Sequence, residues 1–228
     1  MLSWIESFTE LFFPQLCVTC NRKLFTDETY ICIHCRQDFP RTGFHNDPEN
    51  KVAQLFWGRT NVELATSWLY FKKGSHYQKL IHYLKYKGMK ELGAEMGYLF
   101  GLELKESLFA EVEMIMPVPL HKKKEKQRGY NQSEWIAKGM SEAIQKEIST
   151  ANLIRARFTQ TQTRKTRYER WQNVEGIFEV INPDIISGKH VLLVDDVITT
   201  GSTLEAAVYT LLKSGARKVS IATLALAD

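Results

Sequence analysis

The chain has 228 residues, of which 44% are hydrophobic and 25% are charged, and its formal net charge is +4. This length accommodates one domain of ordinary size and a small accessory one, and the hydrophobic share is enough for a well-buried core. The mild positive charge permits contact with phosphates or nucleic acid without requiring it. No apolar run approaches the roughly 18 residues needed to span a bilayer, so we expect no transmembrane segment.

The first residues carry hydrophobic side chains at helical spacing, namely Leu2, Ile5, Phe8 and Phe12. They lack the basic region and the small-residue cleavage site of a secretory signal. We interpret them as a short amphipathic helix that packs on the body. The alternative, a helix on a membrane surface, is disfavoured because its polar face lacks Lys and Arg. We therefore expect a cytoplasmic protein, whose cysteines are more often metal ligands than disulfides.

Four cysteines form two Cys-x-x-Cys pairs, Cys17 with Cys20 and Cys32 with Cys35. Each pair can chelate a metal from a tight turn, and two pairs give tetrahedral thiolate coordination of zinc. Four protein ligands leave no open position, so such a zinc would be structural. An iron–sulfur cluster and four free thiols are the alternatives. We expect an N-terminal helix and a zinc-ribbon-like four-cysteine module within residues 1–45.

A polar stretch at 41–50 is rich in turn-forming residues and predicts a linker or long loop. From about residue 60, strand and helix patterns alternate, while the highly charged segment 121–128 is compatible with a solvated loop. We expect strands at 64–71, 112–118, 178–181, 189–194 and 217–226, and helices at 78–101, 132–148 and 202–213. This order predicts an α/β domain over 60–228, with a central, mainly parallel sheet flanked by helices.

The most informative segment is 191–203, where a buried strand meets two adjacent carboxylates, Asp195 and Asp196, before a helix begins. A run of small residues follows the aspartates and leads into the helix: Thr199, Thr200, Gly201, Ser202 and Thr203. Such residues let backbone N–H groups approach an anion closely, and a helix N-terminus adds unpaired donors and partial positive charge. Ligands of open α/β sheets bind at the carboxyl ends of strands, so we predict a site for a sugar 5′-phosphate here.

The two aspartates add to this prediction, because a carboxylate pair would repel a phosphate placed directly beside it. They suit a neutral diol, such as the 2′- and 3′-hydroxyls of ribose, with a divalent cation nearby. The alternative is a strand end with solvated acids, followed by a capping box of Ser202 and Glu205. That alternative explains neither the adjacent acids nor the hydroxyl-rich run.

Segment 191–203 resembles the signature of type I phosphoribosyltransferases. The resemblance implies that Asp195 and Asp196 hold the ribose diol of 5-phosphoribosyl-1-pyrophosphate, that 199–203 hold its 5′-phosphate, and that Mg²⁺ accompanies it. Other segments resemble the competence protein F (ComF) family: Lys85-Tyr86-Lys87-Gly88, Met116-Pro117-Val118-Pro119-Leu120, Gln127-Arg128-Gly129-Tyr130-Asn131-Gln132, and Thr159, Gln162, Arg170, Asn173, Val174 and Phe178. With the paired cysteines, this resemblance covers nearly the whole chain. Members combine a cysteine-rich module with a phosphoribosyltransferase-like domain, and several are linked to DNA uptake in natural transformation.

Several basic residues are candidates for anion binding. Arg128 offers a guanidinium, and Gly129 after it allows a close approach to pyrophosphate; a solvated basic loop is the alternative. Lys85 and Lys87 lie near a helix end, where cations are favourable without any ligand, so the sequence leaves their role open. We interpret four lysines as a patch that is either solvated or faces nucleic acid: Lys122, Lys123, Lys124 and Lys126.

Residues 155–170 are polar and rich in arginine. The family resemblance implies a mobile hood that closes over the substrate in this region, which would exclude water from the reaction. The same composition suits single-stranded nucleic acid, with available side chains Arg155, Arg157, Arg164, Arg167, Arg170, Tyr168 and Trp171. The stretch 163–167 is more basic than the usual family pattern.

Two functional hypotheses remain. The first is a protein that binds 5-phosphoribosyl-1-pyrophosphate with Mg²⁺ and, if it is an enzyme, transfers phosphoribose to an acceptor that the sequence does not identify. The second is a non-enzymatic competence factor that binds single-stranded DNA, or a partner such as the competence helicase or another DNA-uptake protein. It would use the zinc module and the basic loops.

Overall fold

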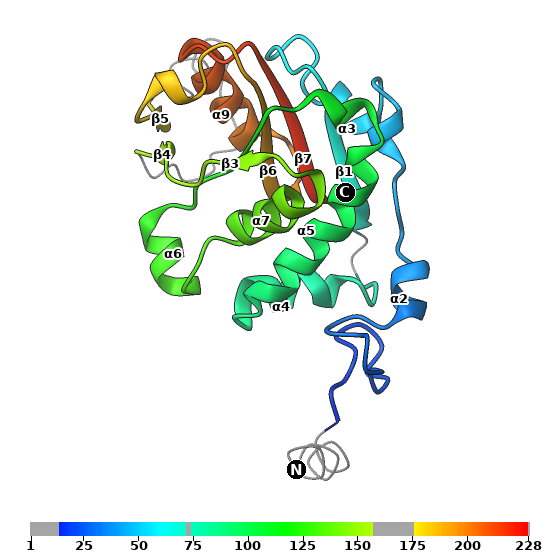
Figure 1. The fold of residues 1–228 in the computed structure, drawn as a ribbon. Helices are drawn as coiled ribbons and strands as arrows, with labels where there is room; N and C mark the ends of the chain where they lie inside the picture. The colour runs from blue at the N-terminus through cyan, green and yellow to red at the C-terminus, as the bar shows by residue number, and fades with distance from the viewer. Residues whose placement is uncertain (1–13, 72–73, 157–175, 228) are drawn as a thin grey trace.

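The computed structural model of the chain describes residues 14–71, 74–156 and 176–227. At its centre lies a five-stranded sheet in which every neighbouring pair is parallel, in the order β1-β7-β6-β2-β3 (Figure 1). Its strands are β1 (Ala65–Phe71), β2 (Met114–Pro117), β3 (Glu147–Ile148), β6 (His190–Ile198) and β7 (Lys218–Ala227). The predicted α/β class with a mainly parallel sheet is confirmed.

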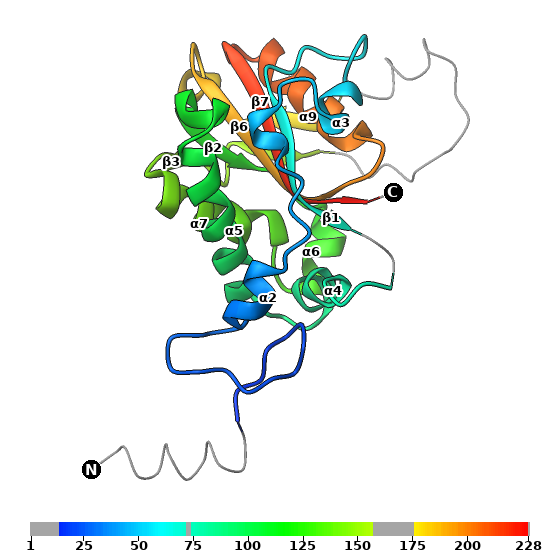
Figure 2. The same cartoon turned by 90° about the vertical axis from the view of Figure 1, so that its right-hand side faces the viewer.

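Helices cover both faces of this sheet (Figure 2). On one face lie α4 (Gln78–Tyr86), α5 (Lys90–Lys105) and α7 (Gln132–Ile144), and on the other lie α3 (Lys51–Gln54) and α9 (Ser202–Lys213). Strand β6 supplies both cores, because Leu192 and Val194 join the cluster under α5 and α7 while Val191 and Leu193 join the cluster under α9. A strand covered on both faces does not need alternating polar and apolar residues, and β6 accordingly begins with a nearly continuous apolar run.

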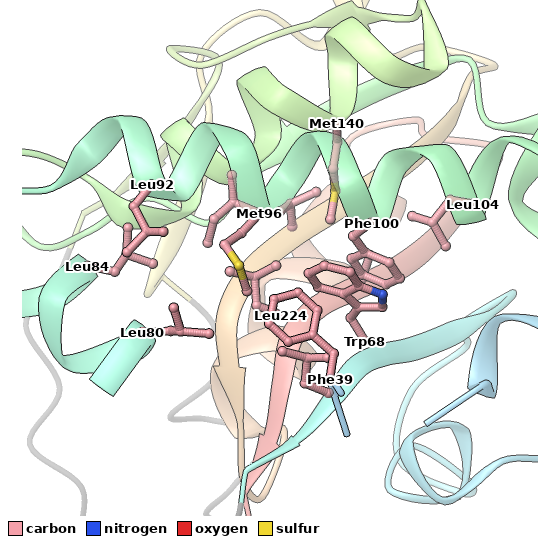
Figure 3. Packing of buried hydrophobic residues seen from close by; sticks show 14 of the residues in the cluster. Phe39, Trp68, Leu80, Leu84, Leu92, Met96, Phe100, Leu104, Met140 and Leu224 are labelled. Atoms are coloured by element: carbon pink, nitrogen blue, oxygen red, sulfur yellow. The ribbon is translucent and has the colours of Figure 1, made fainter. Parts of the chain in front are cut away.

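The core under α5 is built around aromatic rings (Figure 3). Trp68 stacks on Phe100 with ring centroids 5.5 Å apart, and Phe39 meets the edge of Trp68 at 5.2 Å. Helices α5 and α7 contact each other through backbone: a Cβ at Gly97 would lie 2.0 Å from the Ile136 carbonyl oxygen, and one at Gly139 would lie 1.9 Å from that of Ala94. The start of α7 is therefore fixed relative to α5.

The cysteine-rich segment packs against this same core. Helix α2 (Ile33–Gln37) presents Arg36 to Glu95 of α5 in an ion pair, and the Tyr77 hydroxyl donates to the Asp38 carbonyl at 2.8 Å. Buried side chains of the segment, such as Ile31, belong to the cluster under α5 and α7. The division into domains 1–45 and 60–228 stays a prediction.

The stretch 41–50 is more ordered than the expected linker or loop. The Thr42 N–H donates to the Trp68 carbonyl and the Tyr70 N–H donates to the Pro40 carbonyl, each at 2.9 Å, so this stretch lies along the edge of β1. After the short 3₁₀ helix Phe44–Asn46, the Asn50 side chain caps α3 and donates to the Ala65 carbonyl at 2.7 Å. Of the two expected forms, the structure shows a long loop that is held along β1.

Two helix predictions need correction, and one helix was not predicted. The helix expected at 78–101 is two helices, interrupted where Gly88 adopts a φ of +70°. The helix expected at 132–148 ends at Ile144, because Gln145 takes the left-handed conformation and β3 follows. The segment compatible with a solvated loop at 121–128 forms helix α6 (Lys122–Arg128), which begins where the His121 ring accepts from the Lys123 N–H at 3.2 Å.

Further elements complete the described part of the chain. Strand β4 (Leu153–Arg155), which was not predicted, pairs antiparallel with β5 (Phe178–Val180), and 3₁₀ helices occur at Leu108–Glu111 and Pro183–Ile185. Among the described helices, none has the length and apolar composition that crossing a membrane requires. The expected N-terminal helix and the hood residues from 157 onward, including Tyr168 and Trp171, lie outside the described residues.

Candidate functional site

The candidate site lies where two neighbouring strands send their chains to opposite faces of the sheet. Strands β2 and β6 pair in parallel, with Pro117 opposite Val194. The chain after β2 leads through α6 to α7 on one face, whereas the chain after β6 enters α9 on the other. Such a switch point at the carboxyl ends of parallel strands is the usual ligand position of open α/β sheets. The predicted binding site therefore lies at a switch point of this kind.

Asp195 and Asp196 sit near the end of β6, which continues past them to Ile198 rather than stopping before them as expected. Successive side chains of a strand point to opposite faces, but at this end of β6 both carboxylates contact helices of one face, α7 and α4. The Asp195 Oδ1 atom accepts from the Ser133 hydroxyl at 2.7 Å and from the Asp196 backbone N–H at 2.8 Å. The Asp196 Oδ2 atom forms an ion pair with Lys85 Nζ at 3.0 Å.

The surroundings of Asp195 disfavour its charged form. Removal of the carboxyl from water is the largest cause and the neighbouring Asp196 carboxylate the second, and together they raise the pKa of Asp195 to about 7. The hydrogen bonds from Ser133 and from the Asp196 N–H, and the charge of Lys85, act in the opposite direction. A ligand that donates hydroxyl hydrogens to this carboxyl would favour its ionised form.

The predicted phosphate loop follows directly after β6. Thr199, Thr200 and Ser202 are exposed, and Gly201 adopts a φ of +73° as the N-cap of α9. Gly201 has no side chain with which to cap the first amides of the helix, so these N–H groups face outward as potential anion donors. The expected capping box of Ser202 and Glu205 is wrong.

The structure instead gives each residue of that expected box another partner. The Ser202 hydroxyl lies 3.2 Å from the Thr200 hydroxyl, and the Glu205 carboxylate pairs with Arg59. Thr203, half-buried in the first turn, completes the run of small residues. All five residues predicted to hold the phosphate therefore lie in one short loop and helix start beside Asp195 and Asp196.

Arg128 lies at the end of α6, on the rim of the site. Its Nη1 atom donates to the Gln132 side chain at 2.7 Å, and its guanidinium lies 5.8 Å from the centre of the Tyr86 ring. A surface hollow here is lined by Lys85, Tyr86, Gln127 and Arg128. Since Lys85 also pairs with Asp196, the hollow adjoins the aspartate pair. A role of Arg128 in pyrophosphate binding stays a prediction.

Sequence reasoning left out three residues that organise this site. Lys85 was left open, and the only signal for it was its place in the Lys85-Tyr86-Lys87-Gly88 motif. Ser133 is an unremarkable helix residue in sequence, and its hydrogen bond to Asp195 spans 62 positions. Arg59 is more than 140 positions from its partners in the phosphate loop and carried no signal at all.

The four cysteines converge as predicted. Their sulfur atoms all lie within 4.8 Å of one another, Cys20 and Cys32 are 3.6 Å apart, and the Cys32 N–H donates to the Cys17 sulfur at 3.4 Å. Tetrahedral zinc with Zn–S bonds of about 2.3 Å requires sulfurs about 3.8 Å apart, whereas a disulfide needs about 2.05 Å. Cys35 completes the set from α2. The donor set and its spacing fit a structural zinc ion.

Comparisons with known proteins agree with these observations. A model of the phosphoribosyl transferase domain family matches residues 112–228. The DNA utilization protein YhgH of Escherichia coli (strain K12) is 28% identical over 214 residues, which cover 90% of this chain and 88% of that protein. Competence protein F of Haemophilus influenzae is 28% identical over 230 residues, covering 95% of this chain and 99% of that protein.

Two further matches cover less. Competence protein ComFC of Bacillus subtilis is 33% identical over 112 residues, which cover 49% of this chain and 43% of that protein. Glutamine phosphoribosylpyrophosphate amidotransferase from Bacillus subtilis, solved with ADP and GMP, is similar with a TM-score of 0.42 and 24% identity, covering 58% of this chain and 26% of that one. The matches over most of both chains confirm the resemblance to the competence protein F family.

The cysteine cluster generates a first prediction. We expect the purified protein to contain about one zinc per chain, and Cys35→Ser to lose the metal and to lower the melting temperature by about 5 °C or more, because the cluster packs on the core under α5. Elemental analysis and thermal unfolding measure both. Ile33→Ser, at an exposed position of the same helix, should retain the metal. Iron with visible absorbance would indicate a cluster instead, and a metal-free protein would contradict the site.

The raised pKa of Asp195 generates a second prediction. An acid whose folded-state pKa lies above its ordinary value of 3.8, here at about 7, stabilises the fold fully below pH 4 and loses that stabilisation as pH rises through 7. Asp195→Asn removes the loss while keeping an acceptor for Ser133. At pH 8 the variant should exceed the wild type in unfolding free energy by a few kcal/mol, because each pKa unit above the ordinary value of 3.8 corresponds to about 1.4 kcal/mol.

Chemical denaturation between pH 4 and 8 measures this difference. The gain should shrink as pH falls towards 4, where the folded-state carboxyl is protonated and the unfolded-state carboxyl, with its ordinary pKa of 3.8, begins to be protonated as well. Asp184→Asn removes an exposed carboxyl from the 3₁₀ helix Pro183–Ile185 and serves as the matched control. A difference between Asp195→Asn and wild type that is the same at every pH would contradict the effect of burial.

Proposed function

This chain belongs to the phosphoribosyl transferase domain family, and we propose that it binds 5-phosphoribosyl-1-pyrophosphate with Mg²⁺ at the carboxyl ends of β2 and β6. The observation that carries the proposal is the position of Asp195 and Asp196 close to the start of a helix whose N-cap residue, Gly201, has no side chain to bond the first amides. Acids alone would suit a cation, and an uncapped helix N-terminus alone would suit any anion. A sugar phosphate with two free hydroxyls uses both.

Each part of the site has a counterpart in this ligand. Asp195 and Asp196 would accept hydrogen bonds from the ribose hydroxyls, and the amides of 201–203 would donate to the 5′-phosphate. Lys85 and Arg128, which share one hollow, would face the pyrophosphate. Mg²⁺ bound to the pyrophosphate would neutralise its charge and make it a better leaving group.

Calorimetry with 5-phosphoribosyl-1-pyrophosphate and Mg²⁺ tests the proposal. We expect the wild type to bind and the double variant Asp195→Ala/Asp196→Ala to bind at least about a hundredfold more weakly, a loss of about 2.7 kcal/mol for two partners of the diol. Asp184→Asn should bind as the wild type does. A wild-type protein that shows no heat of binding at millimolar ligand would contradict the proposed function.

Transfer of phosphoribose to an acceptor is the further step that family membership suggests. Release of pyrophosphate in the presence of candidate nucleobases or amines would establish an enzyme and name its acceptor class. Binding without release would indicate a protein that retains the ligand site for another purpose. The fold supports both, because one fold hosts different functions.

We propose, as the second candidate, that the chain binds single-stranded DNA and contributes to DNA uptake, with a competence helicase or another DNA-uptake protein as partner. Its support is helix α6, where Lys122, Lys123, Lys124 and Lys126 are exposed. The last residue of α6, Arg128, lies 5.8 Å from the ring of Tyr86, whose exposed fraction is 63%. Lysines that neutralise phosphates and an aromatic ring that stacks on bases are the usual elements of such binding. The names of the relatives point the same way.

Salt dependence tests this candidate. The logarithm of the affinity for an oligothymidine strand should fall by about 0.7 per phosphate contacted for each tenfold rise in salt concentration. Lys122→Gln/Lys126→Gln, which removes two such contacts, should therefore reduce this slope by about 1.4. Fluorescence anisotropy at several salt concentrations measures the slope. The pair Lys51→Gln/Lys105→Gln, exposed on α3 and α5, should leave it unchanged. Equal slopes for both variants, or no binding at low salt, would argue against α6 as a DNA contact.

A further inference from the structure

A single arginine reaches the phosphate loop from a distant part of the chain. Arg59 follows α3 and lies outside residues 112–228, which the family model matches. Its Nη1 atom donates to the carbonyl oxygens of Leu55 and Thr200, each at 2.8 Å. Its Nη2 atom forms an ion pair with Glu205 in the first turn of α9. The guanidinium therefore ties together three points on two segments of the chain.

The bond to Thr200 sets the direction of the next amide. In a planar trans peptide the C=O and N–H groups point in opposite directions. Because the Thr200 carbonyl points towards Arg59, the Gly201 N–H points away from it, towards the open side of the loop. Gly201 itself has a φ of +73°, so this orientation continues into the first uncapped amides of α9.

The ion pair removes an electrostatic conflict. Glu205 lies in the first turn of α9, where its carboxylate favours the helix N-terminus but would repel a phosphate bound there. Arg59 and Glu205 are only 31% and 21% exposed, so their attraction is less screened than on an open surface. With Glu205 neutralised, the loop keeps the positive potential that its amides provide.

The same segment also supports the loop by packing. The Phe56 ring lies so close beneath Gly201 that a Cβ there would approach two ring carbons to 3.0 Å. Phe56 is buried in the core under α9, so it provides a firm contact. Residues 55–59 thus fix the loop from behind by packing, by a carbonyl hydrogen bond and by charge.

We propose that Arg59 is a positioning residue of the phosphate loop, which orients the Thr200–Gly201 peptide and neutralises Glu205 so that the loop can hold a 5′-phosphate. This inference rests on the proposed binding of 5-phosphoribosyl-1-pyrophosphate. Arg59 acts through Thr200 and Glu205 and not by contact with the ligand. It extends the site beyond residues 112–228, to a part of the chain where no binding motif was visible.

The test compares two probes that use different parts of the site. Calorimetry of Arg59→Met should show about tenfold weaker binding of ribose 5-phosphate, which needs the loop, and unchanged binding of Mg²⁺-pyrophosphate, which does not. Arg217→Met removes a similar ion-paired arginine, 2.9 Å from Glu113 at the amino ends of β7 and β2, and should change neither affinity.

A rescue experiment separates positioning from general stability. Adding Glu205→Gln to Arg59→Met removes the unpaired carboxylate and should restore part of the lost affinity, and Arg59→Lys should lie between wild type and Arg59→Met. These milder variants also serve if Arg59→Met does not fold. Equal weakening for both probes, or unchanged ribose 5-phosphate affinity in folded Arg59 variants, would overturn the inference. A wild type that binds neither probe would instead overturn the proposed function itself, and the inference with it.

Discussion

Two adjacent carboxylates at the end of one buried strand are the constraint on which this molecule is organised. Asp195 and Asp196 contact different helices on the same face of the sheet, so the position of each carboxylate depends on its own helix. Asp195 meets Ser133 at the start of α7, and Asp196 meets Lys85 near the end of α4. The helix–helix contact at Gly139 fixes the position of Ser133, because only a residue without a side chain allows α7 to lie so close to α5.

The cysteine-rich segment contributes to the same arrangement from outside the sheet. It packs on the core under α5 and pairs Arg36 with Glu95, while Lys79 of α4 donates to the Thr19 carbonyl at 3.5 Å. These contacts hold the two helices that stand behind the lysine at Asp196. A structural metal in this segment would therefore support the geometry of the binding site as well as the local fold. This gives a physical reason for the two parts to occur in one chain.

The sequence allowed the parallel sheet, the position of the loop 199–203 between a buried strand and a helix, and the cysteine cluster to be predicted, because each depends on a local pattern. A strand of consecutive apolar residues, a run of small hydroxyls before a helix and two Cys-x-x-Cys pairs are all legible within a few positions. Ser133, Lys85 and Arg59 were not predicted as site residues, since their roles depend on contacts across 62, 111 and more than 140 positions. The charged segment that becomes α6 was misjudged for a related reason, since its length and charge suited a loop equally well.

The site combines groups that are costly to hold together in the free protein. Burial and the Asp196 charge both oppose ionisation of Asp195, and the Glu205 carboxylate sits at the helix start where an anion is to bind. Lys85 and Arg59 each offset one of these conflicts without removing it. A diol that donates to Asp195 would favour its ionised form, and a phosphate at Gly201 would engage the uncapped amides. These conflicts in the free site are of the kind that the proposed sugar phosphate would relieve, and its binding would then link the stability of the fold to the chemistry of the site.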